Sequence, residues 1–345
     1  MLRRIVLLAA LLALVLSHAP AGAEDFYKDK TLRMLVGFSP GGGYDTYTRY
    51  IARYIGKYIP GNPTPVVQNM PGAGSLITAN YIFKRAKPDG RTMGVWSPAL
   101  IFAKAMGDKK VPIEPAEYEY IGTPTSDTVT CSLMAASGLK TLDDVVKSGR
   151  VVTMGGTRAP GNTTDPFLFL NKELGTKFKA IPGYGGTAKI RLAMESGEVD
   201  GACWTWESKR VTARGLLDAP PDKRMIPFII AKRLDDPEVK DIPLFSDVLK
   251  GENLAAFNAW NGQNKITRVY TLPPGTPKDR VAVIRKAYKA VMSDPAFLAE
   301  TKKAKLNIAY VSPQDIAKAL QSINNMPPKI KEYLQILTGF KKPKA

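Results

Sequence analysis

Histidine is almost absent from the 345 residues, and its absence excludes several classes of chemistry. The one histidine, His18, lies in an N-terminal segment that we expect to be removed. Histidine is the usual general base at neutral pH and the commonest metal ligand in proteins. Hydrolysis by a serine or cysteine with a histidine base, and ordinary zinc sites, are therefore excluded from the mature chain. We expect no enzyme activity, no catalytic residue, no metal and no cofactor.

Cysteine is the second scarce residue, since Cys131 and Cys203 are the only two. Two cysteines without histidine cannot complete a four-ligand zinc site. In an oxidising compartment they could form a disulfide, which would stabilise the fold by about 4 kcal/mol in the chain-entropy model. They fit equally well as two buried thiols in neighbouring strands, and the sequence leaves both alternatives open.

Long apolar runs are lacking beyond residues 5–16. That run has about 12 residues, whereas a membrane span needs roughly 20. It follows Arg3 and Arg4 and precedes the small residues at 21–23, a pattern typical of a secretory signal peptide. We predict that residues 1–23 are removed by cleavage near Ala23, and that the mature protein is soluble and outside the cytoplasm.

Acidic residues are outnumbered, with 31 against 49 basic ones. Removing residues 1–23 takes away two arginines and no acid, which leaves 47 basic residues and a net charge of +16. Such a surplus attracts anionic partners. The basic residues are scattered and form no nucleic-acid-binding motif, so the pattern favours a small anionic ligand over nucleic acid. A merely solvated basic surface would give the same composition.

Short apolar runs alternate with helical patterns along the chain, which predicts an α/β fold with mainly parallel sheets. The length indicates two domains, and residues 219–243 have the composition of surface loops or of a passage between domains. We expect helices at 44–59, 76–84 and 166–174, with helix starts at Thr141, Thr276-Pro277 and Ser312-Pro313. We expect strands at 31–38, 64–68, 92–96, 130–134, 151–154, 179–181 and 199–204.

Three consecutive glycines, at 41–43, follow the first expected strand and precede a helix. The dinucleotide-binding motif fails here, because Thr46 replaces its third glycine and no acidic residue stands about 20 positions on. Gly-rich turns also follow later strands, at 155–157 and 183–187. Backbone amides of such turns, together with helix N-termini, can hold a carboxylate. We therefore expect turns from the two halves of the chain to face each other around a small acid.

Several short motifs in a fixed order resemble those of one family, the Bug solute-binding proteins of tripartite tricarboxylate transporters. The resemblance runs from about residue 30 to about residue 320. The motifs are Phe38-Ser-Pro-Gly-Gly-Gly-Tyr-Asp45 with Arg49, Gln68-Asn-Met-Pro-Gly-Ala-Gly74, Lys87-Pro-Asp-Gly90 with Thr92, Gly185-Gly186 with Gly197-Glu-Val-Asp200, and Pro274-Gly-Thr-Pro277.

The resemblance implies a two-lobed α/β fold of the type II periplasmic binding protein class, in which each lobe is a mainly parallel sheet flanked by helices. Residues 24–125 and 231–345 would form lobe I, and residues 126–230 lobe II. It also implies a monomeric periplasmic receptor that closes on a small carboxylate and delivers it to the membrane permease subunits. A secreted lyase or isomerase, or a sensory module with the same fold, are the alternatives.

The ligand-binding residues follow from the family motifs, and they fall in both lobes. The resemblance implies Phe38, Gly42, Gly43, Asp45 and Ala73 in the first, and Thr157, Asn162, Thr163, Thr164, Tyr184 and Gly186 in the second. Asp45 fits equally as the cap of a helix beginning at Thr46, Phe38 as core and Thr164 as a cap. Tryptophans near strand ends are either cleft wall or core, and these are Trp96, Trp204 and Trp206.

Two departures from the family pattern concern specificity. Asp165-Pro166 stands where a His-Leu pair is common in the family, and Leu192 or Ala193 replaces a usual aspartate. If that aspartate normally meets a ligand amine, its loss argues against amino acids and for a wholly anionic ligand. Lys189 and Arg191 stand nearby, where they face either the ligand or solvent.

Overall fold

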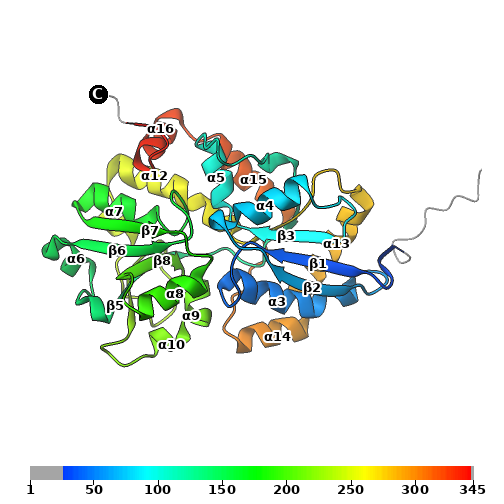
Figure 1. The fold of residues 1–345 in the computed structure, drawn as a ribbon, viewed down its shortest axis with the longest axis horizontal. Coiled ribbons are helices and arrows are strands. Elements are labelled where there is room, and N and C mark those ends of the chain that lie inside the picture. Colours follow the sequence, from blue (N-terminus) through cyan, green and yellow to red (C-terminus); the bar gives the residue numbers. More distant parts are fainter. Residues whose placement is uncertain (1–25, 343–345) are drawn as a thin grey trace, which may run out of the picture.

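The computed structural model describes residues 26–342, which form two five-stranded sheets flanked by helices (Figure 1). The predicted signal peptide and its cleavage site lie outside the described residues. The strand orders are β2-β1-β3-β10-β4 and β7-β6-β8-β5-β9. Within residues 26–342 we find no helix that combines the length and the hydropathy of a membrane span.

The first sheet takes its parallel strands from the N-terminal part of the chain. These are β1 (Thr31–Val36), β2 (Thr64–Asn69) and β3 (Thr92–Trp96), and β10 (Val269–Leu272) runs antiparallel between β3 and β4 (Glu119–Gly122). We call this sheet and the helices packed on it the first lobe. The helices include α3 (Gly43–Ile55), α4 (Leu76–Lys84), α5 (Ala99–Ala105), α13 (Lys278–Met292), α14 (Pro295–Lys303) and α15 (Pro313–Asn324).

The second sheet repeats the same plan with residues from the middle of the chain. Strands β6 (Val151–Gly156), β7 (Lys177–Pro182) and β8 (Gly201–Thr205) are parallel, and β5 (Val129–Met134) runs antiparallel between β8 and β9 (Met225–Ile230). We call this sheet and its helices the second lobe. The helices are α6 (Leu142–Ser148), α7 (Pro166–Leu174), α8 (Thr187–Glu195), α9 (Trp206–Thr212) and α10 (Arg214–Leu217).

Neighbouring residues of a strand point to opposite faces of the sheet, and apolar residues on both faces explain why helices cover both. In β1, Leu35 packs into the core beneath α4, whereas Met34 and Val36 pack into the core beneath α3. Helix α3 buries Ile51 and Ile55 there, as their spacing predicts. Every residue of β3, β5 and β8 is buried, so neither face of these central strands is exposed to solvent.

The predicted elements are confirmed within a few residues, and three details are wrong. Strand β9 lies within residues 219–243, which were predicted to be surface loops or a passage between domains. Helix α13 begins at Lys278 after Pro277, and the Thr276 hydroxyl donates to the Pro273 carbonyl instead of capping the helix. Helix α3 begins before Thr46, so Asp45 is in its first turn and is not its N-cap. The caps at Thr141 and Ser312 are as predicted.

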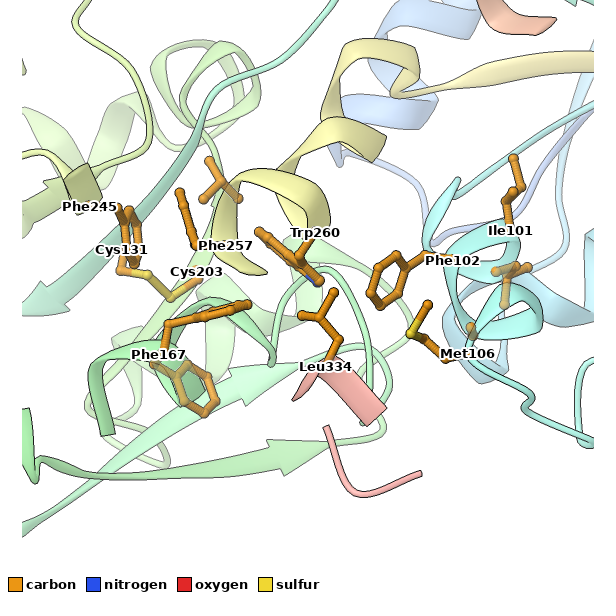
Figure 2. Packing of buried hydrophobic residues seen from close by; sticks show 14 of the residues in the cluster. Ile101, Phe102, Met106, Cys131, Phe167, Cys203, Phe245, Phe257, Trp260 and Leu334 are labelled. Carbon is orange, nitrogen blue, oxygen red and sulfur yellow. A yellow bond between two sulfur atoms is a disulfide. The ribbon is translucent and has the colours of Figure 1, made fainter. Parts of the chain in front are cut away.

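The chain crosses between the lobes twice, after β4 and again between β9 and β10. The second crossing carries α11 (Phe245–Val248) and α12 (Gly251–Asn261). Helix α12 packs beside α7 and α16 (Pro328–Leu337) (Figure 2). The Trp260 indole nitrogen donates to Asp165 of the second lobe. The lobe boundaries remain a prediction, but α12 lies after residue 231, in the part predicted to be lobe I, and nevertheless packs against a helix of the second lobe.

Cys131 and Cys203 lie opposite each other in the antiparallel pair β5 and β8. Both are fully buried, and their sulfurs form a disulfide that lies near Phe245 and Phe167 (Figure 2). The chain has no other cysteine. The bond therefore closes a loop of 72 residues inside the second lobe.

Candidate functional site

A cavity of about 60 Å³ lies where the two lobes meet. Both lobes contribute to its wall. The first lobe supplies Phe38, Gly42, Gly43, Tyr44, Gly74, Ser97, Ala99, Leu100, Thr267 and Arg268; the second supplies Thr157, Arg158, Gly161, Asn162, Thr163, Thr187, Trp204, Thr205 and Ser208.

Helix N-termini converge on this cavity. Gly42 is the N-cap of α3, and Thr187 is the first residue of α8. No side chain caps either helix, and the first intrahelical bond of α3 runs from the Thr46 amide to the Gly42 carbonyl. The preceding amides of α3 are therefore available to a ligand, and the positive ends of both helix dipoles favour an anion.

The glycines in the wall are places where the lobes touch. A Cβ atom on Gly43 would lie 2.4 Å from the Ser208 hydroxyl oxygen, and one on Gly42 would lie 2.8 Å from that of Thr187. A Cβ on Gly74 would lie 2.7 Å from the Cβ of Arg158, across the same boundary. Any larger residue at these positions would push the lobes apart.

Direct bonds also join the lobes beside the cavity. The Ser39 amide donates to the Gly185 carbonyl at 2.9 Å. The Arg191 guanidinium donates to the Gly41 carbonyl at 3.3 Å, and Arg158 forms an ion pair with Asp108 of the first lobe. The structure is therefore a closed arrangement of the two lobes.

Arg268 is the most deeply buried charged residue of the cavity wall. Its side chain is 1% exposed, and its Nη1 forms an ion pair with the fully buried Asp127. The rings of Tyr44 and Tyr47 lie against the guanidinium, with centroids 5.4 and 4.4 Å from Cζ. Burial lowers the pKa of Arg268, but the Asp127 carboxylate outweighs it and raises the pKa above its ordinary value, so the guanidinium stays charged.

Two further buried charged side chains lie behind the wall. Glu207 accepts from the Thr128 amide at 2.8 Å, and burial together with the neighbouring Asp127 raises its pKa. Lys209 donates to the Thr130 carbonyl at 2.8 Å and the Ser132 hydroxyl at 2.7 Å. Burial lowers the pKa of Lys209 well below its ordinary value. Their hydrogen bonds point to protein groups, so we assign both a structural role.

Six of the predicted ligand-binding residues line the cavity, namely Phe38, Gly42, Gly43, Thr157, Asn162 and Thr163. The other five do not. Asp45 is used within the first lobe, because its carboxylate accepts from the Gly41 amide, Arg49 and Asn69. Burial raises the pKa of Asp45, but these three donors more than offset it and hold it below its ordinary value.

The remaining four support the wall from outside. The Thr164 hydroxyl donates to the Arg158 carbonyl, and the Tyr184 hydroxyl to Glu198. Gly186 caps α8 and packs against Ser39, and Ala73 precedes the wall residue Gly74.

The tryptophans divide between core and wall. Trp96 is core, with its indole nitrogen donating to the Thr271 hydroxyl, and that of Trp206 donates to Asp236 outside the cavity. Trp204 lines the cavity. Five further residues of the wall were not predicted as ligand-binding from the sequence, namely Tyr44, Ser97, Ser208, Thr267 and Arg268. No motif marks Arg268, since it reaches the cavity through the second crossing.

The departures from the family pattern have clear positions. Asp165 is buried behind the wall, where it accepts from the Gly161 amide and the Trp260 indole, and burial raises its pKa to about 6. Leu192 is 56% exposed, so it faces away from the cavity. Arg191 bonds the opposite lobe, as described above.

Comparisons with known proteins agree with this architecture, although no family model matches the chain. A UPF0065 protein of Bordetella pertussis is 25% identical over 341 residues, covering 96% of this chain and 97% of the relative. The periplasmic binding protein BugD has a similar structure, with a TM-score of 0.72 at 22% identity, covering 90% of this chain and 98% of its own.

Two proteins of Rhodopseudomonas palustris have similar structures and carry acids. MatC with bound malate gives a TM-score of 0.68 at 19% identity, covering 88% of this chain and 99% of its own. A second protein, with adipate, gives a TM-score of 0.69 at 16% identity, covering 90% of this chain and 97% of its own. The two-lobed periplasmic binding protein fold and the resemblance seen in the motifs are confirmed.

Proposed function

We propose that this chain, a Bug-type solute-binding protein by its motifs, its fold and its full-length relative, is a periplasmic receptor that closes around a small organic carboxylate. No covalent chemistry is involved. The ligand passes to the membrane permease subunits of a tripartite transporter. Malate and adipate in two structural neighbours support a carboxylate as the ligand class.

The charge of the cavity wall is the observation that carries this proposal. The wall contains two arginines, each paired with an aspartate that lies outside the wall, and no aspartate, glutamate or lysine. The N-termini of α3 and α8 add the positive ends of their dipoles. An anion is the complementary ligand, and the volume of about 60 Å³ restricts it to a compact molecule.

The contacts between the lobes supply the mechanism of capture. A ligand that touches both walls binds the closed form more tightly than the open form, so it shifts the population toward closure. The interlobe hydrogen bonds of Ser39 and Arg191 stabilise only the closed form. A permease can then recognise the closed shape.

A thermal-shift screen tests the receptor. The mature protein is heated with succinate, malate, adipate, aromatic acids and amino acids, and a ligand at 100 times its Kd adds about 2.7 kcal/mol to the free energy of unfolding. We expect at least one carboxylate to raise the melting temperature and to reduce the radius of gyration in solution scattering. Melting temperatures unchanged by every acid would contradict the proposal. Conversion of the stabilising acid into a product would favour the lyase or isomerase alternative.

Uptake measurements test the partner. Membrane vesicles containing the large and small permease subunits of a tripartite transporter from the same organism should accumulate the labelled acid only when the receptor is added. Binding without any uptake would leave a receptor that serves a sensor and would contradict the transport role.

A further inference from the structure

We infer that Arg268 selects the ligand: its free guanidinium edge binds one carboxylate of a compact organic acid that carries no amine, with the Trp204 indole as a second side-chain donor. This inference rests on the proposed function and names the residues and the chemical class that the site recognises.

The hydrogen bonding of Arg268 leaves one edge of its guanidinium open. Nη1 is held by Asp127. The Nε atom is buried and has no hydrogen-bond partner. Within residues 26–342 the side-chain hydrogen bond of Arg268 runs through Nη1, and we find none for Nη2. Nε and Nη2 lie on the same edge of the planar group, which is an edge that a carboxylate occupies with two parallel hydrogen bonds.

The surroundings fix where this open edge lies. A Cβ on Gly43 would be 3.0 Å from Nη2, so Nη2 sits at the uncapped N-terminus of α3. Tyr44 and Tyr47 hold the guanidinium between them and Asp127. The backbone of Arg268 has a φ of 62°, in the left-handed region that residues with side chains rarely adopt. Backbone strain of this kind is concentrated at binding sites.

Trp204 offers a second donor from the opposite lobe. It lines the cavity and is 3% exposed, and its indole Nε1 has no partner in the part of the chain described here. Buried indole nitrogens are usually hydrogen-bonded. A carboxylate bound by both residues would bridge the lobes, which is what closure requires.

The absence of acidic side chains from the wall disfavours an amine on the ligand, since the wall offers an ammonium group only neutral acceptors such as Asn162 Oδ1. Asp127 does not line the cavity; it pairs with Arg268 through Oδ2, and its Oδ1 is buried without a partner. The Glu207 carboxylate accepts from the Thr128 amide. An ammonium group in this cavity would lie beside an arginine and helix N-termini with no counter-charge, and burying it there is costly. Amino acids should therefore bind far more weakly than the matching acids.

Calorimetry with the unaltered protein tests the ligand class first. Matched pairs differ only in the amine: succinate and aspartate, glutarate and glutamate, propionate and alanine. We expect the preferred acid to bind at least tenfold more tightly than its amino counterpart. Equal affinities would overturn this inference while leaving the receptor function intact. Failure of every carboxylate to bind would overturn the proposed function as well.

Two substitutions test the residues. Arg268→Lys keeps the positive charge but loses the bidentate guanidinium edge. It should weaken binding of the preferred acid roughly 10- to 100-fold. Trp204→Phe keeps an aromatic ring but loses the indole N–H. It should weaken binding of the preferred acid roughly three- to tenfold. Arg285→Lys is the matched control, because Arg285 pairs with Glu119 outside the cavity. If Arg268→Lys does not fold, Trp204→Phe and the matched pairs decide. Unchanged affinity in Trp204→Phe together with equal binding of amino acids would overturn the assignment.

Discussion

Replacing Gly43 with alanine should prevent the lobes from closing while leaving each lobe folded. The new Cβ would lie 2.4 Å from the Ser208 hydroxyl oxygen, 2.8 Å from the Ser208 Cβ and 3.0 Å from Arg268 Nη2. The hydroxyl can rotate away, but the Ser208 Cβ is fixed to the backbone of α9. Closure is therefore blocked unless the helices separate.

The size of the effect follows from the cost of overpacking. An extra methyl group in a tightly packed contact costs roughly 1–3 kcal/mol. Because the contact exists only when the lobes are closed, this cost falls on the bound state, and it corresponds to roughly 5- to 150-fold weaker binding. The free energy of unfolding without ligand should change by much less, since the open form carries no clash.

Calorimetry and solution scattering measure this effect, with Gly215→Ala as the control. Gly215 lies in helix α10, and nothing lies within 4 Å of a Cβ placed there. Ser208→Gly combined with Gly43→Ala removes the closest atoms and should restore part of the affinity. If Gly43→Ala binds as tightly as the unaltered protein and compacts equally on binding, the closed arrangement described here is not the bound form.

Three further perturbations have expected outcomes. Because burial raises the pKa of Asp165 to about 6, its contribution to the free energy of unfolding is largest below pH 4 and falls by about 3 kcal/mol as the pH rises through 6. Urea unfolding of Asp165→Asn from pH 4 to 7 should lack this fall, and an identical pH profile would refute the assignment. Replacing Cys131 and Cys203 together with alanine should lower the free energy of unfolding by about 4 kcal/mol, measured without reductant; no loss would contradict a disulfide in solution. Arg191→Gln removes the bond to Gly41 and should weaken ligand binding by about fivefold or less without changing the unfolding midpoint; a changed midpoint in the ligand-free protein would indicate a different role.

The sequence predicts most elements of the fold because their signals are local. The apolar face of α3 repeats every three to four residues, and Thr141 and Ser312 are followed by acids at capping positions. Strand β9 escaped prediction because its segment is surrounded by proline, aspartate and lysine. Its partner, β5, lies about 90 residues away, and pairing at that distance leaves no periodic signal.

The cavity wall was predictable where the motifs supply its residues, and Arg268, which no motif marks, was missed. Gly42 and Gly43 stand in a motif whose glycines have a physical reason, namely close approach of the two lobes. Asp45 belongs to the same motif, but its carboxylate is consumed by neighbouring donors. Arg268 comes to the cavity through the return of the chain to the first sheet. Only the three-dimensional pairing of β10 with β3 shows that position.

A structure of the protein with its most stabilising acid is the decisive test of the binding site. We predict a carboxylate in the cavity between the lobes, with its oxygens within about 3 Å of Arg268 Nε and Nη2 and near the N-terminus of α3. A ligand bound outside this cavity, or inside it with an amine or apolar group against Arg268, would show that the proposed site is wrong.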